Sequence, residues 1–174
     1  FKVEQANRPN IIYAGSNAGI LHAFAAKSGN GFEGGQEVWG FIPPFIAGKL
    51  PQIINTEYDK ASGGGTNPIF GVDGSPVVHD AFIRGFNVRG ELEGKRSWRT
   101  LLLIPYGRGG AGFSLLDVTD PVPSGSKGPI HMFSVYNDKI NNKVLVADVN
   151  GRISELEYNA CLLYTSPSPR DQLQ

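Results

Sequence analysis

The stretch IIYAGSNAGILHAFAAKSG, residues 11–29, consists of an apolar segment, a turn of small residues, a second apolar segment and a Ser-Gly exit. The same order of segments returns at residues 101–117 (LLLIPYGRGGAGFSLLD) and 144–158 (VLVADVNGRISELEY). A unit that recurs at this spacing usually cannot bury its own apolar face and must stack on a neighbouring copy. The three stretches therefore predict consecutive sheet blades of a repeat protein.

Further short apolar segments, bounded by Gly, Asn, Asp or Pro, predict more strands after the opening stretch. Evenly spaced short strands joined by a recurring turn are typical of a propeller of four-stranded blades. We predict an all-β fold, a partial β-propeller built from four-stranded antiparallel blades, of which about two to three are present. The strands fall into a first group (10–14, 20–25, 36–42), a second group (75–82, 99–106, 112–118, 131–136) and the beginning of a third (143–149, 152–158).

Helical periodicity is weak throughout the chain. The best candidate is 44–54 (PFIAGKLPQII), where Gly48 and Pro51 limit the prediction to a short helix or a pair of turns. Two polar, Gly-containing insertions, 55–67 and 85–96, are predicted to be surface loops.

Composition restricts the classes of function. Hydrophobic residues make up 40% of the chain and charged residues 18%, which indicates a globular protein. The formal net charge is zero, so the sequence predicts no nucleic-acid partner. No apolar run reaches the roughly 18–20 residues of a membrane span, so we expect no direct membrane insertion. The first residue is Phe1 rather than Met, so the lack of a signal peptide says little about localisation.

The end of the chain differs from the rest. After Asn159 it reads ACLLYTSPSPRDQLQ, without alternation, and CLLYTSPSPRD resembles the translation of a sequencing adaptor. We therefore predict a propeller-like domain at 1–160 and a non-native or disordered tail at 161–174. The single cysteine, Cys161, lies in that tail, so residues 1–160 cannot supply thiol catalysis, a zinc–thiolate site or an intrachain disulfide.

The segment 107–112 (GRGGAG) matches the spacing of a dinucleotide-binding fingerprint. That chemistry requires a helix whose N-terminus faces the pyrophosphate. The residues that follow, 113–121, are strand-like and end at a proline. We therefore predict a glycine-rich hairpin turn and no cofactor site.

Two loops carry oxygen donors of the kind that bind calcium. Neither has the alternating acids, sixth-position glycine and terminal glutamate of an EF-hand loop. The loop 148–151 is better explained as a β-turn held by Asp148, with Asn150 and Gly151 at positive φ. In the loop 137–142, a calcium site would use the three side chains Asp138, Asn141 and Asn142.

No residue set in the sequence predicts catalysis. The three histidines, His22, His79 and His131, lie on separate strands without ligand spacing, so packing or surface positions are expected. No serine-nucleophile or zincin motif is present. The strand aromatics are expected to pack in the core; they are Trp39, Phe41, Trp98, Tyr106, Phe113 and Phe133.

Residues 12–24 (IYAGSNAGILHAF) resemble the blade motif V-Y-V-G-x-N-D-G-x-L-H-A-F of the PilC/PilY family of type IV pilus tip adhesins and assembly factors. Further segments resemble the same family in collinear order across about residues 10–121. They are WGFIPP (39–44), VDGSPVVHD (72–80), WRTLLL (98–103), GRGGAG (107–112) and LDVTDP (116–121).

The chain departs from the family pattern at two places. Ala18 stands where the first turn usually has Asp. Residues 134–142 stand where the family often has an Asp-rich calcium loop, but only Asn137, Asp138, Asn141 and Asn142 remain as side-chain oxygen donors. The resemblance implies calcium as a cofactor, and these departures weaken that implication.

The resemblance implies a non-enzymatic pilus assembly or adhesion factor at the cell surface, a propeller scaffold that presents binding loops. Its implied partners are pilus subunits (minor pilins) and a surface receptor. One alternative is a quinone-dependent dehydrogenase propeller, whose tryptophan-rich docking motifs are missing because Trp occurs only at 39 and 98. A second alternative is a generic propeller scaffold of a secreted or viral assembly.

Overall fold

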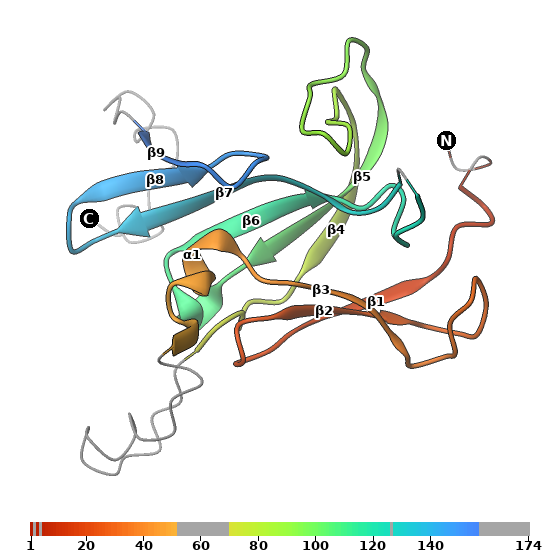
Figure 1. Cartoon of the computed structure of the whole chain (residues 1–174), viewed down its shortest axis with the longest axis horizontal. Helices are drawn as coiled ribbons and strands as arrows, with labels where there is room; N and C mark the ends of the chain where they lie inside the picture. The colour runs from red at the N-terminus through yellow and green to blue at the C-terminus, as the bar shows by residue number, and fades with distance from the viewer. Residues whose placement is uncertain (2, 4, 52–69, 126, 157–174) are drawn as a thin grey trace, which may run out of the picture.

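The computed structural model describes residues 1, 3, 5–51, 70–125 and 127–156. Two antiparallel sheets make up this part of the chain, with strand orders β1-β2-β3 and β4-β5-β6-β7-β8-β9 (Figure 1). The all-β prediction is confirmed. The elements are β1 Ile11–Gly15, β2 Leu21–Ala25, β3 Glu37–Phe41, α1 Pro44–Ala47, β4 Val77–Ile83, β5 Ser97–Pro105, a 3₁₀ turn Gly107–Gly109, β6 Gly112–Asp117, β7 Ile130–Asp138, β8 Lys143–Ala147 and β9 Ile153–Leu156.

The main core lies between the two sheets. Leu21 of the small sheet, Ile46 of α1 and Leu102 and Ile104 of β5 are all fully buried in one cluster. Tyr13, on β1, packs against this cluster, as do Trp39 and Phe41 of β3. Non-directional burial of apolar surface is the main force that holds the sheets together.

Strand β5 has apolar residues on both faces of the large sheet. Thr100, Leu102 and Ile104 are buried against the small sheet, and the residues between them are half-buried. We call the buried side the inner face and the other side the outer face. The strand register places the apolar residues of the outer face beside one another on neighbouring strands. These residues are Leu101, Leu103, Phe113, Leu115, Phe133 and Val135.

The sequence pattern predicts that a third group of strands begins at residue 143, but the described residues 143–156 form no separate group. Strand β8 instead pairs with β7, from Asp138↔Lys143 to Ser134↔Ala147, and β9 pairs with β8. The reason is the short loop 139–142, which returns the chain as a hairpin directly beside β7. The large sheet therefore has six strands, and the described residues form no closed ring of blades.

The sequence predicts that the six strand aromatics pack in the core, but not all of them do. Tyr106 is fully buried, but Trp98 is 50% exposed. Strand β5 has nine residues and the strands of the small sheet have five each, so the Trp98 end of β5 extends beyond its cover.

The short helix expected within 44–54 is confirmed as α1, with proline in its first turn. The end of that range lies outside the described residues, as does the predicted loop 55–67. The predicted loop 85–96 is present at the β4–β5 connection, with an isolated bridge between Phe86 and Leu92. No helix in the described part of the chain is long and apolar enough to cross a membrane.

Candidate functional site

The three predicted calcium ligands lie together in the β7–β8 hairpin. Asp138 ends β7, and its Oδ1 accepts hydrogen bonds from the backbone N–H groups of Ile140 (3.1 Å) and Asn141 (3.2 Å). Its Oδ2 accepts a 2.7 Å hydrogen bond from Nδ2 of Asn141. Asn142 completes the turn at a φ of 53°, a conformation that asparagine tolerates better than most residues. The geometry is that of a turn closed by an aspartate side chain.

The electrostatics of this turn favour a charged Asp138. The hydrogen bond from the Asn141 side chain, followed by that from its backbone, holds the pKa of Asp138 below its ordinary value. Calcium takes six to eight oxygen ligands, but here the one carboxylate already accepts three hydrogen bonds. Among the described residues, no group of three or more His, Cys, Asp or Glu side chains could hold a metal ion. Calcium binding by Asp138, Asn141 and Asn142 stays a prediction.

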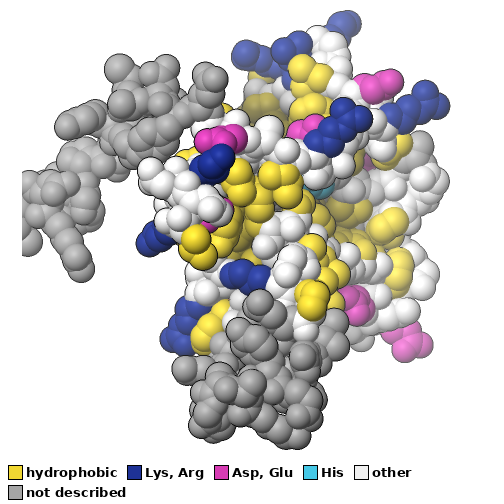
Figure 2. All heavy atoms as spheres, turned by 60° about the vertical axis from the view of Figure 1, so that its left-hand side comes forward, with side chains coloured by type: hydrophobic (Ala, Val, Ile, Leu, Met, Phe, Trp, Pro, Cys, Tyr) yellow, Lys and Arg dark blue, Asp and Glu magenta, His cyan; other side chains and the backbone are white. Residues whose placement is uncertain are grey.

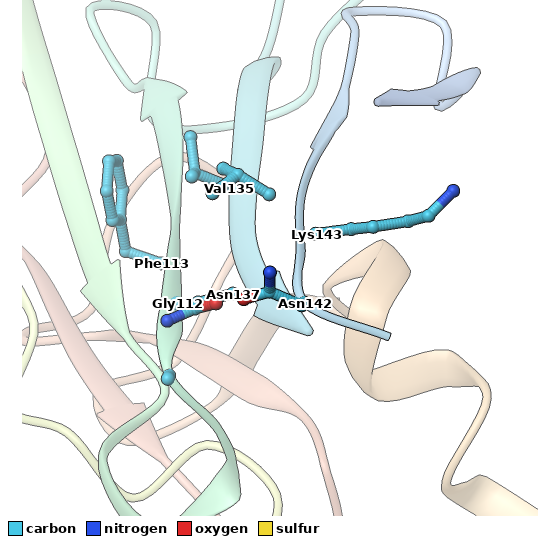
Figure 3. Close-up of a pocket in the computed structure, with 8 residues that line it drawn as sticks. Gly112, Phe113, Val135, Asn137, Asn142 and Lys143 are labelled. Atoms are coloured by element: carbon cyan, nitrogen blue, oxygen red, sulfur yellow. The ribbon is translucent and has the colours of Figure 1, made fainter. Parts of the chain in front are cut away.

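A groove of about 700 Å³ lies beside this hairpin on the outer face. Phe113 and Val135 line it from β6 and β7, Asn137 and Asn142 line it at the hairpin end, and the Lys143 side chain extends away from these residues (Figure 3). Phe113 also makes an edge-to-face contact with Phe133, with ring centroids 6.0 Å apart. The groove is therefore apolar along the strands and polar at the loop, so it is suited to binding by burial of apolar surface.

The glycine-rich segment 107–112 forms the predicted hairpin turn, and strand β6 follows it directly. A Cβ at Gly109 would overlap the carbonyl oxygen of Gly71, and a Cβ at Gly74 would overlap that of Pro105. The glycines therefore permit two chain segments to approach closely. The carbonyl oxygen of Gly109 also accepts a hydrogen bond from Nζ of Lys49. These contacts give the segment a structural role.

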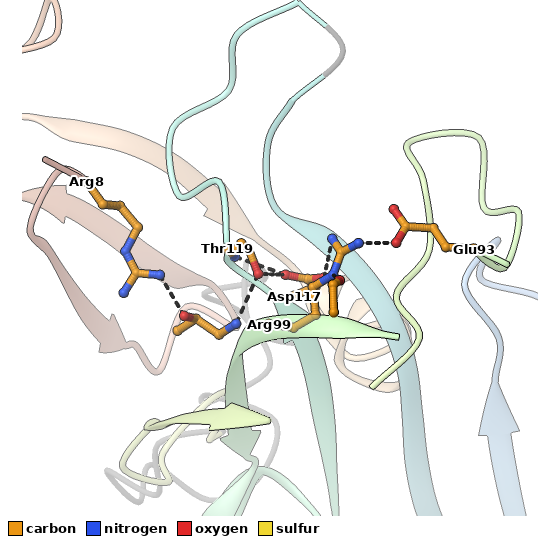
Figure 4. A network of polar contacts seen from close by, with 7 residues as sticks. Arg8, Glu93, Arg99, Asp117 and Thr119 are labelled. Carbon is orange, nitrogen blue, oxygen red and sulfur yellow. Dashed lines mark hydrogen bonds and ion pairs between the residues drawn. The ribbon is translucent and has the colours of Figure 1, made fainter. Parts of the chain in front are cut away.

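The WRT and LDVTDP segments meet in a polar network at the β5–β6 end of the core (Figure 4). Asp117, 2% exposed, accepts hydrogen bonds from the backbone N–H (2.9 Å) and the hydroxyl (2.6 Å) of Thr119. Its other oxygen lies 3.3 Å from Nη1 of Arg99, and Arg99 also pairs with Glu93. These carboxylates raise the pKa of Arg99 despite the opposing effect of burial. The ion pair ties the β4–β5 connection to β6.

A second branch of the network joins the N-terminal segment to the large sheet. Nη1 of Arg8 donates a 2.6 Å hydrogen bond to Oγ1 of Thr100. The Thr100 hydroxyl in turn donates to Oδ1 of Asp80, at 2.7 Å. On the small sheet, Nε1 of Trp39 donates a 2.8 Å hydrogen bond to the carbonyl of Pro121. The Trp39 hydrogen bond fastens the small sheet to the segment that follows β6, and the Arg8 hydrogen bond fastens the N-terminal segment to β5.

The histidines occupy three different settings and do not converge. Nδ1 of His22 lies 2.8 Å from Glu37 on the adjacent strand. His79 is exposed on β4. His131 is half-buried, stacks on Phe41 with ring centroids 5.7 Å apart, and has a pKa lowered chiefly by burial. The predicted packing and surface positions are confirmed.

Sequence patterns did not reveal a chain of hydroxyl groups in the inner face. The Tyr106 hydroxyl lies 2.8 Å from Oγ of Ser114, which lies 2.7 Å from Oγ of Ser134. Oγ of Ser134 lies 2.8 Å from Nε2 of His131. Both serines are fully buried, so each must have a hydrogen-bond partner. The one sequence signal for the buried position of Ser114 is its spacing of two residues from Leu116, because residues two apart in a strand lie on the same face.

The other predicted turn, at 148–151, is also present. Oδ1 of Asp148 accepts from the backbone N–H groups of Asn150 and Arg152, each at 2.9 Å. Only Gly151 has a positive φ, 75°, whereas the sequence predicts it for Asn150 as well. The carboxylate thus closes a turn, as expected from its position between two strands.

Comparison with known proteins gives a consistent set of relatives. No family model matches the chain. The type IV pilus biogenesis factor PilY1 of Pseudomonas aeruginosa (strain UCBPP-PA14) is 37% identical over 121 residues, which are 70% of this chain and 8% of that protein. A PilY1 homolog of Xylella fastidiosa is 33% identical over 121 residues, again 70% of this chain and 8% of the relative. The chain thus spans about 8% of the length of these curated relatives.

Among solved structures, the crystal structure of the P. aeruginosa PilY1 C-terminal domain resembles the chain with a TM-score of 0.44 and 24% sequence identity. The resemblance covers 90% of this chain and 32% of that domain. At this TM-score the structures do not establish a common fold, so the assignment rests on the sequence matches and on the motifs that agree with them. The chain belongs to the PilC/PilY family of type IV pilus biogenesis factors.

Proposed function

We propose that this chain is part of a non-enzymatic type IV pilus assembly or adhesion factor, in which the sheets are a scaffold for binding loops. The 37% identity to PilY1 over 121 residues carries the proposal. We further propose that the whole protein acts at the cell surface, with minor pilins and a surface receptor as partners.

The contacts of the motif residues support a scaffold role. Arg99, Asp117 and Gly109 hold segments of the backbone together. Rigid sheets commonly position loops that carry binding function. On this proposal, specificity belongs to the loops between strands, and the motif segments keep those loops in place.

The outer face supports a propeller architecture for the longer protein. An antiparallel sheet with one solvated face normally alternates apolar and polar residues, but 101–104 of β5 read Leu-Leu-Leu-Ile. Leu103 and Leu115 pair on the half-buried face. We propose that another blade covers this face, within a domain ending at about residue 160, and that 161–174 is not part of the fold.

A gene-replacement experiment tests the function. Deleting the complete gene from its source organism should remove surface pili or their adhesion, and the intact gene should restore them. A version carrying Asp117→Asn should restore them poorly, while Glu155→Gln, in an exposed ion pair, should restore them fully. Unchanged piliation and adhesion after deletion would contradict the proposal. Quinone-dependent turnover by the complete protein would contradict its non-enzymatic part.

A further inference from the structure

The β4–β5 hairpin extends away from the rest of the described molecule (Figure 1). Strand β5 extends beyond the small sheet here, so the cross-strand pair Phe82 and Trp98 is left 53% and 50% exposed. Their ring centroids are 5.7 Å apart. Phe1 stacks on Trp98 at 6.1 Å, yet half of the indole remains accessible. Val88 and Leu92, in the connection, are 55% and 50% exposed.

Basic side chains surround these apolar residues. Arg84, Arg89, Lys95 and Arg96 are all exposed. Within the described residues, none of the four forms an ion pair. The nearby acids are engaged, since Glu93 pairs with Arg99 and Glu91 accepts a 2.7 Å hydrogen bond from Nδ2 of Asn87. Figure 2 shows Lys and Arg side chains around hydrophobic ones at the top of the view, the end at which the hairpin lies.

Hydrogen bonds within the β4–β5 connection order its backbone. Oδ1 of Asn87 accepts from the backbone N–H groups of Arg89 (2.9 Å) and Glu91 (3.0 Å). The backbone N–H of Glu93 donates to the carbonyl of Gly85 at 2.9 Å. A surface that is already ordered loses little conformational entropy when it binds a partner.

We propose that this surface, which we call the hairpin surface and define as Phe82, Arg84, Val88, Arg89, Leu92, Lys95, Arg96 and Trp98, docks an acidic protein segment that also carries apolar side chains. Exposed cations select a negatively charged partner and steer its approach. Exposed tryptophan, phenylalanine and arginine are the residue types enriched at protein interfaces.

The composition argues against an anionic membrane as the occupant. Glu91 and Glu93 lie in the same connection, and a membrane-binding surface would place carboxylates close to lipid phosphates. Arginine outnumbers lysine among the cations of the hairpin surface, and its planar guanidinium matches the geometry of a carboxylate.

The test measures binding of the whole chain to a synthetic 14-residue peptide of alternating Glu and Leu, with a Gln-for-Glu peptide of equal length as the uncharged control. Fluorescence of the tryptophans and calorimetry report affinity over a salt series. Saturable binding to the Glu peptide that weakens with salt, with little binding to the Gln peptide, supports the proposal.

Variants locate the binding surface. Arg84→Gln with Arg96→Gln should weaken binding about tenfold at low salt and reduce its salt dependence. Trp98→Ala should weaken binding about tenfold, measured by calorimetry because the reporter is removed. Lys27→Gln with Lys139→Gln, exposed cations elsewhere, should change affinity less than about twofold. Far-UV circular dichroism checks that every variant keeps the fold of the parent.

Three outcomes would overturn the proposal. One is that the Lys27→Gln and Lys139→Gln control weakens peptide binding as much as the Arg84→Gln and Arg96→Gln variant does. Another is no saturable binding of the Glu peptide. The third is binding only to phosphatidylcholine vesicles that contain phosphatidylglycerol, lost in the Arg84 and Arg96 variant, which would assign the hairpin surface to a membrane instead.

Discussion

The two faces of the six-stranded sheet have nearly the same apolar character in sequence but differ in what covers them. On the inner face, Leu102 and Ile104 are completely buried against the small sheet. On the outer face, Leu103 and Leu115 are only half-buried, and a groove lies farther along the same face, beside Phe113. Apolar residues thus lie on both faces, and the described residues bury only the inner one. Strand composition therefore shows which faces carry apolar residues, whereas tertiary contacts decide which of those faces is buried.

The largest expected effect compares one leucine from each face. Leu102→Ala should lower the free energy of unfolding by about 3 kcal/mol, because it leaves a cavity in a fully buried site. Leu115→Ala should cost roughly 1 kcal/mol, since its side chain is only half-buried. Urea denaturation followed by circular dichroism measures both. Equal costs would mean that the outer face is covered as well as the inner one, and would break the comparison.

The next largest change in the free energy of unfolding is expected from breaking an ion pair. Asp117→Asn should cost about 3 kcal/mol, because it leaves the Arg99 guanidinium, 15% exposed, without its buried partner. The matched change Glu155→Gln, in the half-exposed Lys143–Glu155 pair, should cost about 0–1 kcal/mol. The same denaturation experiment compares the two variants. A cost for Asp117→Asn as small as that for Glu155→Gln would show that the ion pair does not stabilise the attachment of the β4–β5 connection to β6.

A smaller effect should come from His131, at the edge of the inner face. Burial lowers its pKa in the folded protein, whereas the unfolded chain has a value of about 6.5. As the pH falls below about 6.5, the unfolded chain binds a proton that the folded protein resists, so stability should decrease until the folded pKa is passed. The negative charge of Asp148 opposes this shift. Melting temperature measured against pH is the test.

Two variants separate His131 from the other histidines. His131→Gln should flatten the decrease in stability below pH 6.5, because glutamine does not titrate. His79→Gln, at an exposed position, should leave the decrease unchanged. An identical pH profile for the parent and His131→Gln would contradict the assignment.

The smallest expected effect is at the β7–β8 hairpin. If Asp138, Asn141 and Asn142 bind calcium, millimolar Ca²⁺ should raise the melting temperature slightly and Mg²⁺ should not. Asp138→Asn should abolish the rise, because the only carboxylate of the set is lost. An unchanged melting temperature in calcium would leave Asp138 with the turn-closing role that its three hydrogen bonds describe.

Much of the fold could be predicted from local sequence. The alternating segments predicted the strands. The glycine-rich segment predicted a hairpin turn followed by a strand, and Asp148 predicted a second turn. The third group of strands was wrong because pairing partners are set by loop geometry, and the loop 139–142 returns β8 to the edge of the existing sheet. Trp98 was misplaced because its burial depends on the length of a different sheet.

The candidate site could be predicted only in part. The sequence correctly grouped Asp138, Asn141 and Asn142 into one loop, because neighbours in a short turn are close in space. It did not show that this loop borders a groove, or that Ser114, Ser134 and His131 form one hydrogen-bonded chain. The Ser114–Ser134 hydrogen bond joins β6 to β7, and the groove is lined from several strands, so both depend on strand register.

By itself, the sequence determined an all-β chain of short strands and its membership of the PilC/PilY family, since both are carried by motifs a few residues long. The tertiary structure alone decided that the two sheets enclose one core, that the outer face stays half-exposed, and that the β4–β5 hairpin extends beyond its cover. The physical reason is that turn chemistry and alternation act between near neighbours. Burial, in contrast, is fixed by segments as distant as Leu21 and Leu102, which meet only when the sheets pack.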